Sequence, residues 1–525
     1  LVAVMALFII SYSLTPVRSD NDVWWHLKTG RILWETRSLP GHDVLAYTSG
    51  DIPWHNHEWL AQVIMYGFYL LGDGTLQGGM RMVILLKALA LLASFVLLFI
   101  HMKRDVRSVP IAVLGVLWAV ILSRRTIYPR PPVFTYFFFI LFLFLMHEVH
   151  EKRIPRRWIW ILCPLMVLWV NTHGGFLLGI IIAGAYFAGE LYPVVVRRVS
   201  YKDTGALPYG LLLAALLLCS LVNPYSWHLY LLPGRVMSDM GLVRAIPELL
   251  SPDFFFTRGL EALLLFLIAA PFLVKKPVLN IAEGLLLLFF LHNGVQHVRH
   301  VPLAGMIAIP ICARYLRELA ALDLPQVVKR AIPAVICLLI AAVAGYNLLN
   351  CREGESFLDR NMNYFSGEGY YESRYPVKEA DFILANDFQG RMYNQINYAG
   401  YLIWRMSPES HKVFTDSRYD IFGGRFMRQE QAVQQGIDRK FRADDETWED
   451  ILNKWQVNFI LITADAPVNF LLDQSPNWKL VYHRPEPYSM VSRSGFKIYI
   501  RDIPENRALI ERCLRSASAM SPEPM

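Results

Sequence analysis

The sequence predicts a polytopic α-helical membrane protein, with about 11 transmembrane helices, that carries a soluble α/β domain at its C-terminal end. Of its 525 residues, 54% are hydrophobic and 18% are charged, whereas soluble domains carry about 25% charged residues. The charge deficit is uneven, because long apolar runs fill only residues 1–350. We therefore expect a membrane domain over 1–350 with a large outer loop at 17–80. An extracytoplasmic α/β domain should follow over 351–515, with a disordered tail at 516–525.

Apolar runs locate the membrane helices. A spanning helix needs about 20 mostly apolar residues, with about 17 as the lower limit. The expected spans are 1–16, 81–101, 108–123, 131–149, 158–171, 176–196, 207–222, 259–274, 278–292, 301–316 and 330–349. The apolar segment 59–72 is shorter, and we expect it to lie at the membrane interface.

Basic residues set the expected orientation. The loops between spans alternate between two sides, and one set of loops holds most of the lysine and arginine. This set is 103–107, 152–157, 197–202, 275–276 and 314–330. By the positive-inside rule it is cytoplasmic, which puts the soluble domain outside the cytoplasm. The same rule accounts for the net charge of +7, so this charge does not indicate a nucleic-acid partner.

The soluble part alternates between helical and strand patterns. The expected helices are 377–387, 399–406 and 446–455, and the expected strands are 391–396, 411–418, 457–463, 478–484, 488–493 and 496–502. Neither a G-x-G-x-x-G motif nor a P-loop is present, so the sequence does not indicate nucleotide binding.

Unusual polar residues concentrate in the loops on the expected outer side. Five loops from distant parts of the chain supply aspartate, glutamate, histidine, asparagine and arginine. They are 17–80, 123–132, 171–175, 223–235 and 293–300. A carboxylate at a membrane surface can accept a proton from an acceptor hydroxyl or amine, or bind a divalent cation that bridges to phosphate. The loops therefore predict a working site near the outer leaflet.

The first outer loop holds several candidates for this site. Asp20 and Asp22 are candidates for the base or for a cation site, and the alternative is a pair of solvated loop acids. Trp24 and Trp25 offer surfaces for stacking on sugar rings, or belong to an interfacial aromatic belt. The loop also supplies His26, His57 and Glu58, for which a metal site, a proton relay and an ordinary surface position are all open.

Three arginines, Arg124, Arg125 and Arg130, break the charge rule because they lie on the expected outer side. Guanidinium groups bind phosphate through paired hydrogen bonds. Arg299 is a further phosphate candidate, and contact with outer-leaflet headgroups is the alternative for all of them.

Two histidines and one ion pair complete the candidates. His173 lies between two spans in Asn-Thr-His-Gly-Gly, and an ionisable residue at a span end is a functional candidate. His300 belongs to the polar segment 293–300. Asp416 and Arg418 follow an expected strand, and we expect them to form a local ion pair rather than a catalytic site.

This arrangement resembles the GT-C superfamily of membrane glycosyltransferases. An acidic residue soon after the first span, Asp22 in NDVWWHLKTGRIL, is similar to the acidic motif of that superfamily. The pattern D-x-W-W-H-L-x-x-G…W-x-x-H-E-W-L also resembles a bacterial subgroup of predicted glycosyltransferases. Further similar blocks are RPPVFTYFFF, WVNTHGGFLLG, NPYSW, RHVPLAG, YNQINYAGYLIWRM and VFTDSRYD.

The resemblance implies an enzyme of the bacterial inner (plasma) membrane whose soluble domain is periplasmic or extracellular. It would transfer a hexosyl or pentosyl group, with inversion, from a polyprenyl-phosphate donor to a glycan, lipid or protein acceptor. Asp22 would be the base, and Glu58 and His57 are further catalytic candidates. The donor phosphate would meet Arg125, Arg130 and Arg299. The substrate-binding candidates are Trp24, Trp25, His26, His173 and His300.

Metal dependence stays open at this stage. Asn21-Asp22-Val23 replaces the paired Asp-Glu of the aminoarabinose transferases. The residues that could bind a divalent cation such as Mg²⁺ or Mn²⁺ are Asp20, Asp22 and His57.

Two other functions stay open. One is a lipid–glycan transporter, and the other is a non-catalytic GT-C-like scaffold that uses its soluble domain for binding. Transporters often show paired repeats and charged residues near the membrane centre. The sequence shows neither, which favours an enzyme.

Overall fold

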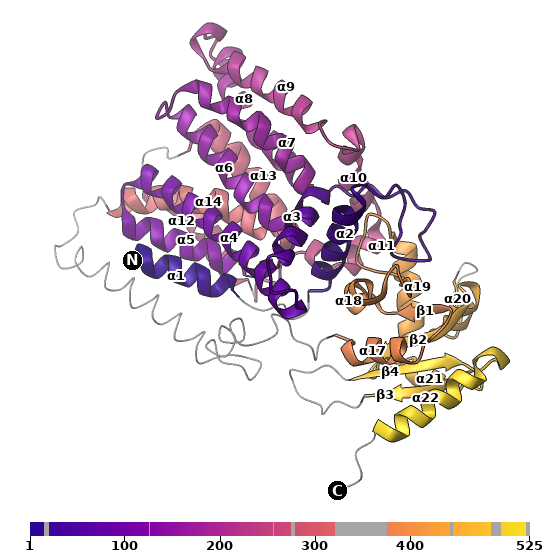
Figure 1. The fold of residues 1–525 in the computed structure, drawn as a ribbon. Helices are drawn as coiled ribbons and strands as arrows, with labels where there is room; N and C mark the ends of the chain where they lie inside the picture. Colours follow the sequence, from indigo (N-terminus) through magenta and orange to yellow (C-terminus); the bar gives the residue numbers. More distant parts are fainter. Residues whose placement is uncertain are drawn as a thin grey trace. The chain divides into compact units, whose positions relative to one another are not determined.

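The computed structural model describes residues 1–14, 20–124, 126–255, 257–274, 279–320, 375–440, 445–484 and 495–520. The chain divides into two compact units (Figure 1). Unit 1 comprises Leu1–Pro16, His57–Leu229 and Ile246–Gly367, and unit 2 comprises Val17–Asn56, Tyr230–Ala245 and Glu368–Met525. The first part of the long outer loop thus groups with the C-terminal residues. The domain boundaries expected from the sequence stay a prediction.

Unit 1 is helical in the part that the structure describes. Its α-helices are α1 (Val2–Ser13), α3 (Trp59–Leu70), α4 (Leu76–Val106), α5 (Val109–Ser123), α6 (Pro132–His150), α7 (Leu162–Thr172), α8 (Phe176–Val196), α9 (Ala206–Ser220), α12 (Arg258–Leu273), α13 (Ile281–Gln296) and α14 (Val301–Ala320). Short 3₁₀ turns are η1 (Arg156–Ile161), η2 (Tyr201–Asp203), η4 (Pro247–Leu249) and η5 (Val298–His300), and η3 (Ser226–Leu231) crosses the boundary between the units.

Each expected span before residue 320 coincides with a helix, although 158–171 begins as a 3₁₀ turn. Among the described residues, α4, α6 and α8 are long and apolar enough to cross a membrane. Large apolar side chains also remain exposed on other helices, including Phe272 at 87% and Leu288 at 72%. Water would penalise such faces and lipid would not. These helices indicate a membrane protein, and the expected total of about 11 spans stays a prediction because 330–349 lies outside the described residues.

Charged side chains gather where α4, α6, α13 and α14 meet. The two ring nitrogens of His147 lie 3.4 Å from Asp105 and 3.4 Å from Glu283. Arg314 contacts the same two carboxylates at 3.2 Å and 2.7 Å, and Arg153 lies 2.9 Å from Asp105. We call Asp105, His147, Glu283 and Arg314 the inner charge cluster. It ties together the helix ends that are expected to face the cytoplasm.

Unit 2 contains a small mixed sheet and short helices. Its strands are β1 (Arg391–Asn394), β2 (Val457–Thr463), β3 (Trp478–His483) and β4 (Phe496–Arg501), in the order β1-β2-β4-β3. Strand β1 pairs with β2 in parallel, and the other two pairings are antiparallel. The helices are α2 (Asp22–Thr36), α10 (Leu232–Ser238), α11 (Met240–Ala245), α17 (Val377–Ala385), α18 (Ile396–Met406), α19 (Gly424–Gln435), α20 (Trp448–Lys454), α21 (Asn469–Gln474), η7 (Pro504–Asn506) and α22 (Arg507–Met520).

The sequence pattern was wrong about a strand at 411–418. Val413 makes only an isolated bridge with Ala46. The next backbone groups bond to a side chain, because the Phe414 N–H donates to Asn394 Oδ1 at 2.7 Å and Asn394 Nδ2 donates to the Thr415 carbonyl at 3.0 Å. The chain then turns at Asp416 instead of extending the sheet.

Two expectations near the C-terminus concern residues that lie partly or wholly outside the described part of the chain. The expected strand 488–493 lies wholly outside it. Helix α22 runs through Met520 and thus overlaps the tail that we expected to be disordered, and residues 521–525 lie outside the described part.

Candidate functional site

Asp22 is the first residue of α2, in unit 2. One of its carboxylate oxygens accepts a hydrogen bond from the Ser417 hydroxyl, and its backbone N–H donates to Asp20 Oδ1 at 3.2 Å. The position at the helix start suits a negative charge, because the unpaired N–H groups there carry partial positive charge. Asp22 is therefore held as an oriented carboxylate rather than as part of a solvated loop.

Asn21 fixes this segment onto α18. Its side-chain amide donates to the Ile396 carbonyl at 2.7 Å, and its side-chain oxygen accepts from the Gly400 N–H at 2.6 Å. The Ile396 carbonyl and the Gly400 N–H are i,i+4 partners in a regular helix. The Asn21 carboxamide therefore bonds to both members of one backbone pair of α18. The approach needs glycine at position 400, since an added Cβ would lie 1.9 Å from the Asn21 carbonyl oxygen.

The double contact explains why asparagine stands at position 21. An aspartate is acceptor-only when ionised, and it would meet the Ile396 carbonyl with no proton between them. The departure from the paired Asp-Glu pattern thus has a structural cause in this chain.

A buried ionic triad flanks Ser417. The Arg418 guanidinium contacts Asp43 at 2.8 and 3.0 Å and Asp416 at 2.9 and 2.6 Å, and the three side chains are 0% exposed. Burial alone would lower the pKa of Arg418, but Asp416 and Asp43 together raise it. The expected Asp416–Arg418 ion pair is confirmed, and Asp43, which the sequence did not single out, completes it.

The aromatic candidates of the first outer loop lie in the interior of unit 2. Trp24 is 0% exposed and packs edge-on against Tyr375 and Tyr401 at ring distances of 5.3 and 5.2 Å. Trp25 and His26 are buried with their rings 3.6 Å apart. Substrate binding by these three residues stays a prediction, and for Trp24 it would require the ring to leave its tyrosine neighbours.

In unit 1, Glu58 lies beside His173, with 3.6 Å between Oε1 and Nε2. The Gly175 N–H donates to His173 Nδ1 at 2.9 Å, so Nδ1 is an acceptor and the ring proton lies on Nε2. Thr135 also lies 2.8 Å from Nδ1 and receives the Trp169 indole N–H at 3.0 Å. We call Glu58 and His173 the outer pair.

The surroundings of His173 keep its ring neutral. Burial, followed by the charges of His57 and Arg299, lowers the pKa of His173 to about 3. A neutral ring with its proton on Nε2 can donate toward Glu58 and orient that carboxylate. His57 lies 4.0 Å from Glu58 and also lies beside Gly174, so the Asn-Thr-His-Gly-Gly segment and the His57-Glu58 segment are brought together.

The arginine candidates lie near Glu248. Arg130 contacts this carboxylate at 3.4 Å and stacks over Tyr128 at 4.6 Å. Burial lowers the pKa of Arg299, and Glu248 raises it. Burial, followed by the charges of Arg299 and His297, likewise lowers the pKa of His300 to about 3. Phosphate binding by Arg130 and Arg299 stays a prediction, and Arg125 lies outside the described residues.

The described part of the chain offers no ligand set for the expected divalent cation. No group of three or more histidine, cysteine, aspartate or glutamate residues there is arranged to hold an ion. One oxygen of Asp20 and one of Asp22 already accept hydrogen bonds. Metal binding by Asp20, Asp22 and His57 stays a prediction, and so does the expectation that Asp22, His57 and the arginines act at one site.

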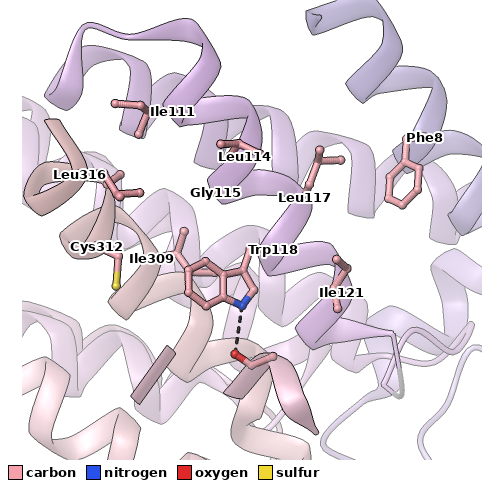
Figure 2. Close-up of a pocket in the computed structure, with 12 residues that line it drawn as sticks. Phe8, Ile111, Leu114, Gly115, Leu117, Trp118, Ile121, Ile309, Cys312 and Leu316 are labelled. Atoms are coloured by element: carbon pink, nitrogen blue, oxygen red, sulfur yellow. Dashed lines mark hydrogen bonds between the residues drawn. The ribbon is translucent and has the colours of Figure 1, made fainter. Parts of the chain in front are cut away.

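A separate apolar cavity of about 390 Å³ lies among α1, α5, α12 and α14 (Figure 2). Its lining includes Phe8, Leu114, Ile309 and Cys312. The Trp118 indole N–H is already bonded to the Gly259 carbonyl at 3.0 Å. The cavity therefore suits a hydrocarbon chain and not a sugar or a phosphate.

No family model and no curated protein matches the chain. Solved structures do. The oligosaccharyltransferase of Archaeoglobus fulgidus with a tethered acceptor peptide has a TM-score of 0.53 at 11% identity, covering 94% of this chain and 73% of that chain. The archaeal oligosaccharyltransferase AglB from the same organism, in complex with an inhibitory peptide and a dolichol-phosphate, has a TM-score of 0.55 at 10% identity, covering 88% of this chain and 69% of that chain. The fold of this chain is similar to that of these oligosaccharyltransferase structures. At this identity the likeness concerns the fold alone.

Proposed function

We propose that the chain is a membrane glycosyltransferase that moves a sugar from a polyprenyl-phosphate-linked donor to an acceptor on the extracytoplasmic side. The observation that carries the proposal is the fixed carboxylate of Asp22 in a chain whose fold follows an oligosaccharyltransferase over most of its length. A bacterial inner membrane location and a periplasmic or extracellular soluble domain belong to the same proposal.

Asp22 acts as the base in this mechanism. Its carboxylate takes the proton of an acceptor hydroxyl or amine while the acceptor atom attacks the anomeric carbon. The bond from that carbon to the phosphate oxygen breaks, and the phosphate leaves with the electron pair, which inverts the configuration. Arg130 and Arg299, with Arg125, neutralise the departing phosphate.

The outer pair binds the sugar or the acceptor in this proposal. The neutral His173 ring holds Glu58 in one orientation, and a fixed carboxylate is a strong acceptor for sugar hydroxyl groups. His57 lies beside Glu58 and supplies a further polar contact, and His300 is a further substrate-binding residue in the proposal. The apolar cavity of Figure 2 suits part of the polyprenyl tail.

The test uses purified full-length protein in proteoliposomes with a panel of polyprenyl-phosphate hexoses and pentoses and solubilised host membranes as the acceptor source. Release of polyprenyl phosphate is followed by mass spectrometry. Asp22→Asn should lower turnover by about 10²–10⁴-fold, while Asp51→Asn, an exposed acid of the same loop, should match the wild type. Undiminished turnover by Asp22→Asn would remove Asp22 from the mechanism. Donor binding without turnover by the wild type would favour the non-catalytic scaffold.

A further inference from the structure

Ser417 is the contact through which the C-terminal part of the chain holds Asp22. Its hydroxyl accepts the Asn21 amide N–H at 3.4 Å and donates its own proton to Asp22 Oδ1, across 395 positions of sequence. The direction is fixed by chemistry, because an ionised carboxylate can only accept. One oxygen of the proposed base is therefore bonded to a residue of the C-terminal part.

Both neighbours of Ser417 are immobilised. Asp416 and Arg418 belong to the buried triad with Asp43, in which the guanidinium makes two contacts to each carboxylate. Arg418 also lies 4.7 Å over the Trp54 ring. The backbone just before Ser417 is bonded to Asn394, whose side chain accepts the Phe414 N–H and donates to the Thr415 carbonyl. The backbone at Ser417 thus has little freedom to move.

The partner segment is immobilised as well. Asn21 is inserted into α18, and the Asp22 N–H is bonded to Asp20. A hydrogen bond between two groups that are already fixed costs little further conformational entropy and sets the orientation of the carboxylate tightly. Accurate placement of a base is worth several factors of ten in rate.

We infer that Ser417 is a positioning residue for Asp22, and that the Thr415–Arg418 turn makes the soluble domain part of the catalytic apparatus rather than a separate binding module. The inference rests on the proposed function. The fold likeness and the acidic motif do not give the VFTDSRYD block a role, whereas the positioning of Asp22 by Ser417 does.

The experiment compares Ser417→Ala, Ser417→Thr and Ser410→Ala, the last an exposed serine of the same domain, in the full-length protein with the donor that the wild type turns over. Ser417→Ala should lower kcat about tenfold to hundredfold, less than loss of the base itself. The KM for the donor should change less than about twofold and Tm should stay within a few degrees of the wild type. Ser417→Thr keeps the hydroxyl and should restore most of kcat, and Ser410→Ala should match the wild type.

The outcomes separate this inference from the proposed function. Wild-type kcat in Ser417→Ala, with Asp22→Asn inactive, would overturn the positioning role and leave the function standing. A parallel loss of kcat and Tm that threonine does not rescue would make Ser417 merely structural and also overturn it. Full activity of Asp22→Asn would instead overturn the proposed function.

Discussion

The inner charge cluster and the outer pair of unit 1 each place a histidine beside a carboxylate, and they are fixed by different means. In the inner charge cluster, His147 lies between Asp105 and Glu283, and Arg314 contacts both acids. In the outer pair, His173 lies beside Glu58 and is oriented on its other side by a backbone N–H and a hydroxyl.

The difference separates a structural role from a chemical one. The inner side chains are at most 12% exposed and their charges are neutralised within the protein, so they hold helices together. The outer pair is more open, at 23% for His173 and 12% for Glu58, and its histidine is neutral. Similar residue types thus stabilise helix packing in the inner charge cluster and form a candidate binding surface in the outer pair.

Removing the Arg314 guanidinium from the inner charge cluster should have the largest effect on stability. Arg314→Met removes a guanidinium that contacts both buried carboxylates, and breaking a buried pair costs about 3–5 kcal/mol. Thermal unfolding in detergent should show a Tm that is lower by several degrees, while Arg157→Met, at an exposed position, should show no change. A wild-type Tm for Arg314→Met would mean that the inner charge cluster does not stabilise the packing of the helices.

The matching change in the outer pair should alter activity instead. Glu58→Gln should lower transfer about a hundredfold, as expected for loss of a catalytic or orienting carboxylate, while Tm stays nearly constant because no charge is left unpaired. Glu283→Gln should do the reverse, with a lower Tm and the kcat of the remaining folded protein near that of the wild type. If both variants lose stability equally, the contrast between the two groups fails.

A third test asks whether hydrogen bonds alone can fix a site as firmly as charges do. Asn21→Asp removes the donor to the Ile396 carbonyl and should lower the free energy of unfolding of unit 2 by about 1–3 kcal/mol, with transfer falling as well. Asn477→Asp, at an exposed position, is the control. Equal stability of the two variants would show that the Asn21 bridge contributes nothing.

The last test concerns Glu430, a buried carboxylate that has no ion pair among the described residues. Burial raises its pKa from 4.5 to about 7. The folded state therefore holds a proton that the unfolded state releases, and stability should fall as pH rises from about 4.5 to 7, by at most about 1.4 kcal/mol per pH unit. Glu430→Gln should flatten the dependence of Tm on pH in this window, and an unchanged slope would contradict the assignment.

Much of the fold could be predicted because the signals are local. Apolar runs gave the helices of unit 1, since length and composition are enough. An apolar β-branched run gave β2, and alternating residues gave β3 and β4. The strand at 411–418 was wrong because Asn394, a side chain elsewhere in the sequence, takes the backbone bonds of that segment.

The site was less predictable. The resemblance singled out Asp22, and VFTDSRYD entered only as a similar block. Nothing in the local pattern shows that Ser417 meets Asp22, or that Asn21 enters α18, because these contacts join positions almost 400 residues apart. The inner charge cluster was missed for another reason, since Asp105 looks like an ordinary loop acid among basic neighbours.

The bridge made by Asn21 also has a consequence for biosynthesis. Asn21 is translated well before Ile396 and Gly400, which follow 375 and 379 positions later, about 20–75 s at ordinary elongation rates. Until they emerge, the segment around Asp22 lacks its docking helix and its serine. Under the proposed function, copies that end before Ser417 are silent toward the lipid donors around them, and synthesis beyond this residue allows the reaction to begin.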